Sequence, residues 1–247
     1  MPHLTTPDAR LAATEAGRLG FGVPGYAHPL VAPVEWAELG RPGTPLHWAV
    51  LNVSDGPGQR PDPHCIDAVT RLREAGGSVI GHLAVRDGRR SFGELVSEAH
   101  AFRDWYRVDG FYLAQTPADR AELPSVRRVA DTLRTLGDGL RIVLGHGTHP
   151  YPGYAEVGDQ LVTFSGSWTD YRWSQVAEWT AELPPERFCH FVHGVPRTHL
   201  EEAVRIARWQ GAGTIWFTDR RGAGDPWAGM PGYWDEIVSR IGPGVSE

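Results

Sequence analysis

Eight short apolar runs, separated by stretches with helical or turn character, constrain this sequence more than any other feature. The candidate strands are 19–23, 47–52, 78–85, 110–114, 141–144, 160–164, 188–193 and 214–218. Short apolar strands that alternate with helices are typical of a parallel sheet with crossover connections. Eight such units in 247 residues fit one (β/α)8 barrel. We therefore predict a single TIM-like barrel over residues 19–247, preceded by an N-terminal extension at 1–18.

Helical periodicity supports this prediction between the strands. The segment 65–75 places Ile66, Val69 and Leu72 at three-residue spacing, as an amphipathic helix requires. Further helices are expected at 95–106, 124–136, 173–182 and 198–210. Thr198 followed by Glu201 predicts a capping box at the start of the last of these.

Composition excludes several kinds of chemistry. All 24 basic residues are arginine, so no side-chain amine can form a Schiff base with a substrate or with pyridoxal phosphate. The net charge of −6 gives no electrostatic reason to expect a nucleic-acid partner. Cys65 and Cys189 lack the paired spacing of a zinc or redox motif, and we interpret both as packing residues. We expect no cofactor, and the oligomeric state is left open.

The chain also lacks targeting and membrane patterns. Its first residues are partly acidic and contain no continuous apolar run of signal-peptide length, so we expect a cytoplasmic protein. No segment approaches the roughly 20 apolar residues that cross a bilayer. We therefore expect no membrane partner.

The active site of such a barrel lies where the strands end and the following loops begin. Polar and titratable residues are frequent at these positions. They are Tyr26, His28, Asn52, Asp55, His82, Asp87, Gln115, His146, His149, Ser165, Asp170, His193 and Asp219. We expect the site among them.

Several segments, in order along the chain, resemble the spherulin-4-like family, also called spherulation-specific family 4. The matching segments are 23–29 (VPGYAHP), 51–58 (LNVSDGPG), 79–82 (VIGH), 105–113 (WYRVDGFYL), 216–219 (WFTD) and 231–234 (PGYW). The resemblance implies a barrel related to glycosidases that act on galactosamine-containing polysaccharides. It spans nearly the whole chain.

The sequence departs from the family pattern where the resemblance implies catalysis. The family has an Asp-Glu pair at the end of the fourth strand, where this chain has Ala114 and Gln115, and a Glu at the end of the sixth, where it has Ser165. Glycoside hydrolysis normally needs two carboxyl groups, and neutral side chains cannot transfer the protons. Conversely, the family pattern has Gly-Tyr on the third strand where this chain has Gly81-His82, and Asn-Pro at the end of the fifth strand where it has Gly145-His146. The inherited mechanism is therefore not expected to operate.

The candidate catalytic residues are His82, His146, His193 and Asp170. The three histidines follow the third, fifth and seventh strands, so their side chains could converge at the barrel mouth, and histidine both accepts and donates protons near neutral pH. Structural hydrogen bonding is the alternative for each, and a metal site, which we do not expect, would add a carboxylate. The candidate substrate-binding residues are Tyr26, His28, Asn52, Gln115, Trp168 and Asp219.

Simpler interpretations stand beside several of these candidates. Asp55 lies in a DGPG turn and would bond nearby backbone amides, while His149 would lie on a surface loop. Trp168 and Trp173 flank Asp170 as sugar platforms often flank polar groups, but core packing of both explains them equally well.

Two functional hypotheses follow. The first is a diverged intracellular enzyme that uses His and Asp for acid-base chemistry on a small or glycosylated metabolite. The second is a non-catalytic carbohydrate-binding relative, in which Gln115 still bonds a sugar hydroxyl. A residual glycoside hydrolase that uses Asp170 or Asp219 ranks below both.

Overall fold

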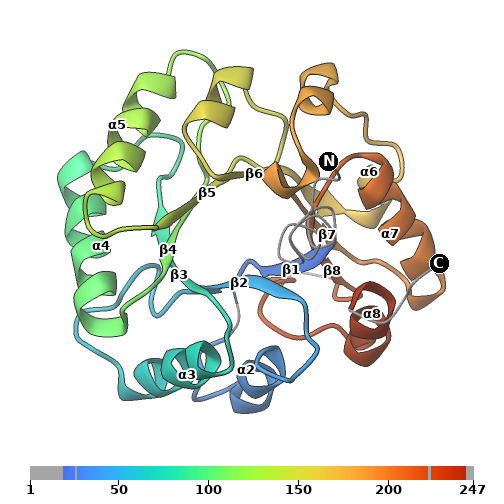
Figure 1. Ribbon diagram of the computed structural model, residues 1–247, viewed down its shortest axis with the longest axis horizontal. Coiled ribbons are helices and arrows are strands. Elements are labelled where there is room, and N and C mark those ends of the chain that lie inside the picture. Colours follow the sequence, from blue (N-terminus) through green and yellow to red (C-terminus); the bar gives the residue numbers. More distant parts are fainter. Residues whose placement is uncertain (1–18, 26, 222–223, 243–247) are drawn as a thin grey trace, which may run out of the picture.

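The computed structural model describes residues 19–25, 27–221 and 224–242, and within them eight parallel strands close into a barrel (Figure 1). Each strand pairs with its neighbour in chain order, and β8 pairs with β1. The strands are β1 Gly20–Val23, β2 Leu46–Leu51, β3 Val79–Ala84, β4 Gly110–Ala114, β5 Arg141–Gly145, β6 Gln160–Ser167, β7 Phe188–His193 and β8 Thr214–Thr218. The predicted (β/α)8 barrel is confirmed. Seven strands lie within one residue of their predicted bounds, and β6 continues three residues beyond its predicted end at Phe164.

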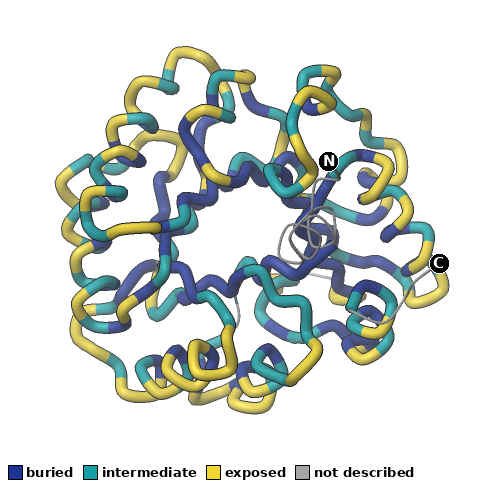
Figure 2. Tube along the Cα trace, viewed as in Figure 1, coloured by how far each residue is buried: buried dark blue, intermediate teal, exposed yellow. Residues whose placement is uncertain are grey.

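An outer layer of helices surrounds the barrel. The α-helices are α2 Pro33–Leu39, α3 Pro63–Glu74, α4 Phe92–Tyr106, α5 Leu123–Arg134, α6 Trp168–Tyr171, α7 Leu200–Trp209 and α8 Trp234–Ile241. The 3-10 helices are η1 Pro152–Glu156, η2 Glu178–Glu182, η3 Pro185–Arg187 and η4 Arg197–His199. Figure 2 shows the usual division of such a barrel, with buried strands and helices whose outer faces are exposed. None of the helices in the described ranges is long and apolar enough to cross a membrane.

Side-chain caps account for where two of the helices begin. Asp62 precedes α3 and its carboxylate accepts hydrogen bonds from the amides of His64 and Cys65. Ser91 and Glu94 form a reciprocal capping box at the start of α4. The capping box predicted at Thr198 is wrong: the Thr198 hydroxyl lies 3.1 Å from Nδ1 of His199, and α7 begins without a side-chain cap.

The helix predicted at 173–182 is also wrong. A single helical turn, α6, ends at Tyr171, irregular chain follows, and only η2 covers the end of the predicted range. The cause is a tertiary contact: the side chain of Gln210 donates hydrogen bonds to the carbonyl and the hydroxyl of Ser174. This carbonyl is therefore bonded to another part of the chain instead of to a following helical turn. Helices α2 and α8 were not predicted from the sequence.

The barrel interior is filled by aromatic rings above a polar layer. Trp48, Tyr112 and Phe191 meet with ring centroids 6.1–6.4 Å apart. Below them Nε1 of Trp48 donates to Gln160, whose amide donates in turn to Thr214. The Trp48 indole, the Gln160 amide and the Thr214 hydroxyl therefore all have hydrogen-bond partners, as buried polar groups require.

Close backbone approach around the barrel requires glycine at the start of β4. A Cβ atom built on Gly110 would lie far inside van der Waals contact with the backbone carbonyl of Arg141 on β5. This neighbour is a strand backbone and cannot move aside without disturbing the sheet.

We therefore expect Gly110→Ala to destabilise the barrel by about 3 kcal/mol, at the upper end of overpacking costs. In thermal unfolding this corresponds to a loss of roughly 10 °C in Tm for a domain of this size. Gly93→Ala in α4 is the matched control, because a Cβ atom at this position would meet no atom of a neighbouring element within 4 Å. Equal melting temperatures for the two variants would contradict this account of Gly110.

Candidate functional site

A pocket of about 680 Å³ opens at the carboxyl ends of the strands. This volume is typical of small-molecule sites. Its lining residues come from loops or strand ends around the barrel: Pro24, Gly25, Asn52, Asp55, His82, Ala84, Asp87, Tyr112, Ala114, Gln115, Thr116, Gly145, His146, Gly147, Ser165, Phe191, Asp225 and Trp227. The aromatic rings of Tyr112 and Phe191 separate it from the polar layer below.

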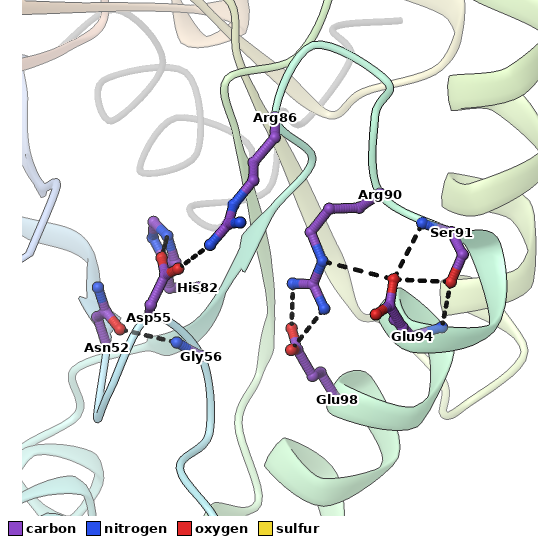
Figure 3. Close-up of polar contacts among 9 residues, drawn as sticks. All are labelled: Asn52, Asp55, Gly56, His82, Arg86, Arg90, Ser91, Glu94 and Glu98. Carbon is purple, nitrogen blue, oxygen red and sulfur yellow. Dashed lines mark hydrogen bonds and ion pairs between the residues drawn. The ribbon is translucent and has the colours of Figure 1, made fainter.

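His82 and Asp55 form the central polar pair of the pocket (Figure 3). His82 is on β3, where Ala84 also faces the pocket and the intervening Leu83 is buried. Its Nε2 lies 4.0 Å from a carboxylate oxygen of Asp55, and Figure 3 shows the guanidinium of Arg86 bonded to the same carboxylate. The side chain of His82 is 15% exposed, whereas that of Asp55 is 58% exposed. A nearly buried imidazole thus faces a carboxylate at the pocket rim.

Burial lowers the pKa of His82, although the negative charges of Asp55 and Glu98 oppose this effect. At neutral pH the imidazole is therefore uncharged and can accept a proton. The expected turn interaction is also present at this loop, but Asn52 makes it: its side-chain oxygen accepts the amide hydrogen of Gly56 at 3.0 Å. The Asp55 carboxylate is directed instead to Arg86 and His82.

Unusual backbone conformations cluster around the same pair. Asp55, Arg86, Asp87 and Gln115 all have φ between 52° and 54°, in the left-handed region that non-glycine residues rarely occupy. Three of the four line the pocket. Such conformations cost free energy and concentrate at functional sites, so their grouping here supports the assignment of this pocket.

His146 also lines the pocket, but its surroundings are those of a neutral structural group. Its Nδ1 lies 2.9 Å from the carbonyl oxygen of Pro117 and 3.2 Å from that of Thr116, so this nitrogen carries the proton. Burial lowers its pKa to about 4, despite the two carbonyls, which raise it. Its Nε2 is buried without a hydrogen-bond partner in the described structure. His149 lies outside the pocket lining, and burial lowers its pKa as well.

The remaining proposed residues are not brought together with these. The His193 ring packs edge-on against Trp227, which lines the pocket, but His193 itself does not line it. Asp170 accepts a hydrogen bond from the Ser167 hydroxyl at the start of α6, and Trp168 is buried against Tyr171 and His199. The core-packing interpretation of Trp168 therefore fits the structure.

Two further candidates lie in other surroundings. Asp219 accepts the amide hydrogen of Gly232. His28 lies beside Asp62 and Cys65 at the start of α3. Tyr26 lies outside the described residues, as does the extension at 1–18.

The three positions at which the resemblance implies carboxylates do meet in the pocket. Ala114, Gln115 and Ser165 all line it, and none can act as a carboxyl acid or nucleophile. Tyr112, Phe191, Trp227 and Asp225 also line the pocket but were not predicted from the sequence. Alternation along the strands could have placed Tyr112 and Phe191 inside the barrel, whereas no pattern marks the loop that carries Asp225 and Trp227.

Comparison with known proteins places this site in a family context. The sequence model of spherulation-specific family 4 matches residues 21–241. Spherulin-4 of Physarum polycephalum is 22% identical over 176 residues, which is 70% of this chain and 52% of the relative, so the chain spans about half the length of this curated relative.

Solved structures show the same fold. Aspergillus clavatus Sph3, in complex with GalNAc, aligns with a TM-score of 0.80 at 23% identity, over 92% of this chain and 98% of that one. Alpha-galactosidase I of Mortierella vinacea aligns with a TM-score of 0.57 at 7% identity, over 91% and 70% of the two chains. With nearly the whole barrel covered by the family model, this chain belongs to spherulation-specific family 4.

Proposed function

We propose that the pocket binds an amino-sugar unit of a saccharide. We further propose that His82, assisted by Asp55, removes a proton from the water that hydrolyses the glycosidic bond of this unit. One observation carries the proposal: an imidazole whose pKa is lowered by burial faces a carboxylate, 4.0 Å away, inside a pocket whose three family acid positions hold neutral residues. The proton-transfer groups of this site are thus different residues from those that the family pattern implies.

The lining of the pocket suits a sugar. Tyr112, Phe191 and Trp227 offer aromatic surface, and the amides of Asn52 and Gln115 can bond hydroxyl groups. Sph3, which shares the fold, was solved with GalNAc. A sugar ligand in the equivalent barrel of this chain is the proposal that this similarity supports.

Carboxylates at the rim favour a sugar with a free amino group. Asp87 and Asp225 line the pocket, are exposed, and form no ion pair with any residue of the described ranges. A protonated amine would supply the missing positive charge, whereas an N-acetyl group is neutral. We therefore expect unacetylated amino sugars to bind more tightly than acetylated ones.

The chemistry follows from the charge state of His82. In hydrolysis of a glycosidic bond, the neutral imidazole accepts a proton from the water whose oxygen bonds to the anomeric carbon as the glycosidic C–O bond breaks. The leaving oxygen takes a proton from solvent, and the imidazolium, which the adjacent Asp55 carboxylate stabilises, returns its proton to solvent. Arg86 forms an ion pair with the same carboxylate, and its positive charge weakens the stabilisation of the imidazolium by Asp55. His82 acts as a base in this scheme.

The second candidate function is sugar binding without turnover. It is favoured by the neutral side chains at Ala114, Gln115 and Ser165, which leave binding groups but remove both family acids. The two functions differ in one measurable property, because only the first has a rate that depends on His82.

The charge coupling at His82 can be measured directly by NMR titration of its ring nitrogens. Asp55→Asn removes the negative charge that favours the imidazolium, so the pKa of His82 should fall further below its ordinary value. Arg86→Gln frees the Asp55 carboxylate and should raise the same pKa. Asp104→Asn, on the exposed face of α4, is the control and should change nothing. A His82 titration that is identical in Asp55→Asn and the parent would refute the pairing.

The enzyme hypothesis is tested by reducing-end release from galactosamine-containing oligosaccharides. His82→Gln should lower kcat by roughly 100- to 10,000-fold with little change in KM, the usual contribution of a general base. Parent kcat should also fall as the pH drops through the lowered pKa of His82, because the protonated ring cannot accept a proton. His100→Gln, an exposed histidine on α4, should retain parent activity.

The outcomes separate the two candidate functions. Binding of the oligosaccharide without turnover by the parent protein would select the non-catalytic alternative. Unchanged kcat in His82→Gln would exclude proton transfer by this residue.

A further inference from the structure

A histidine, a carboxylate and a thiol meet outside the pocket, where the loop after β1 approaches the start of α3. Nε2 of His28 lies 3.4 Å from Sγ of Cys65 and 3.4 Å from a carboxylate oxygen of Asp62. One potential ligand atom from each of the three residues lies within 4.8 Å of the others. It is the one such group of three or more His, Cys, Asp or Glu side chains among the residues that the structure describes.

We propose that His28, Asp62 and Cys65 form a binding site for a Zn²⁺ ion. Zinc bonds of about 2.0–2.1 Å to nitrogen and oxygen and about 2.3 Å to sulfur, in tetrahedral geometry, separate the ligand atoms by roughly 3.3–3.6 Å. Both distances from His28 fall in this range. A mixed set of sulfur, imidazole and carboxylate donors is also one that zinc accepts and that magnesium or calcium does not favour.

The surrounding structure holds two of the ligands in place. Asp62 caps α3 through hydrogen bonds from the amides of His64 and Cys65, and its own amide donates to the hydroxyl of Tyr106. That hydroxyl donates in turn to the carbonyl of Pro57. Cys65 is fully buried, whereas the side chains of His28 and Asp62 are 26% and 30% exposed. An ion can therefore enter between the exposed pair and reach the thiol.

The fourth zinc ligand would come from the open side. His64 is exposed, its ring centroid lies 6.5 Å from that of His28, and it lines a cleft of about 160 Å³ beside α2. Figure 1 shows α2 and α3 side by side at this edge of the barrel. Either the His64 imidazole or water can complete a tetrahedral site here.

Zinc binding changes the protonation of the cluster in a defined way. Burial, together with the nearby Asp62, raises the pKa of the Cys65 thiol to about 12. The metal-free thiol is thus protonated, and bond formation to zinc releases its proton to solvent. Nδ1 of His28 accepts the exposed amide of Leu30, which leaves the ring proton on Nε2. That proton must move to Nδ1 when Nε2 binds the metal, which breaks the hydrogen bond from the Leu30 amide and leaves this exposed amide to water.

The site is distinct from the pocket, although Gly25, which lines the pocket, precedes His28 by only three residues. The proposal does not depend on the proposed function, because metal binding is measured without a substrate.

Cobalt(II) is the probe, since it replaces zinc and has visible absorption. Metal-stripped full-length protein should bind one Co²⁺ per chain, with a thiolate-to-cobalt charge-transfer band in the near ultraviolet and intense tetrahedral bands in the visible. Zn²⁺ should displace it, and zinc binding to the metal-free protein should release about one proton per ion at neutral pH. Cys65→Ser should abolish the charge-transfer band, and His28→Gln should weaken binding at least tenfold.

Two controls keep the test decisive. Cys189→Ser alters the other buried cysteine and His100→Gln alters an exposed histidine remote from the cluster, so both should retain the parent spectrum. If Cys65→Ser fails to fold by circular dichroism, the folded His28→Gln variant decides the matter. A parent protein without the charge-transfer band, or a band that survives in Cys65→Ser, would overturn the proposal.

Discussion

A closed barrel of eight parallel strands is stable only if side chains fill its interior, and three aromatic rings meet this requirement here. Trp48, Tyr112 and Phe191 pack against one another across the barrel, and the indole of Trp48 is bonded to Gln160 below. Because this layer fills the centre of the barrel, the space above it remains open as the pocket. Two of these rings, Tyr112 and Phe191, thus also form the floor of the site, and a sugar would rest on surface that already exists for structural reasons.

Most of the fold could be predicted from the sequence, because a barrel repeats one local pattern eight times. Short apolar runs marked every strand, and periodic apolar residues marked α3, α4, α5 and α7. The failures have different causes. The segment 173–182 has helical composition, but Gln210 on the neighbouring chain segment bonds the backbone at Ser174 and leaves it irregular. Helix α8 was missed although Trp234, Ile237 and Ile241 have helical spacing and are buried.

The site was predictable only where it lies directly at the ends of strands. Gln115 and His146 directly follow β4 and β5, and His82 and Ser165 lie two residues before the ends of β3 and β6, so all four reach the pocket. Asp170 does not, because β6 continues to Ser167, which then caps α6 and accepts the amide of Asp170. Contacts between residues far apart in the sequence could not be predicted, because no spacing connects Asp55 with His82 and Arg86, or His28 with Cys65. These contacts exist only after the chain has closed into a barrel.

We propose that this member of the family binds an amino sugar on the aromatic floor beside His82 and Asp55. The decisive experiment is a crystal structure of the protein soaked with galactosamine. We expect a sugar ring against Trp227 or Tyr112, with its amino group toward the carboxylates of Asp87 or Asp225 and a hydroxyl within hydrogen-bonding distance of Nε2 of His82. Sugar bound elsewhere, for example on the exposed indoles of Trp173 or Trp209, with an empty barrel pocket, would contradict it.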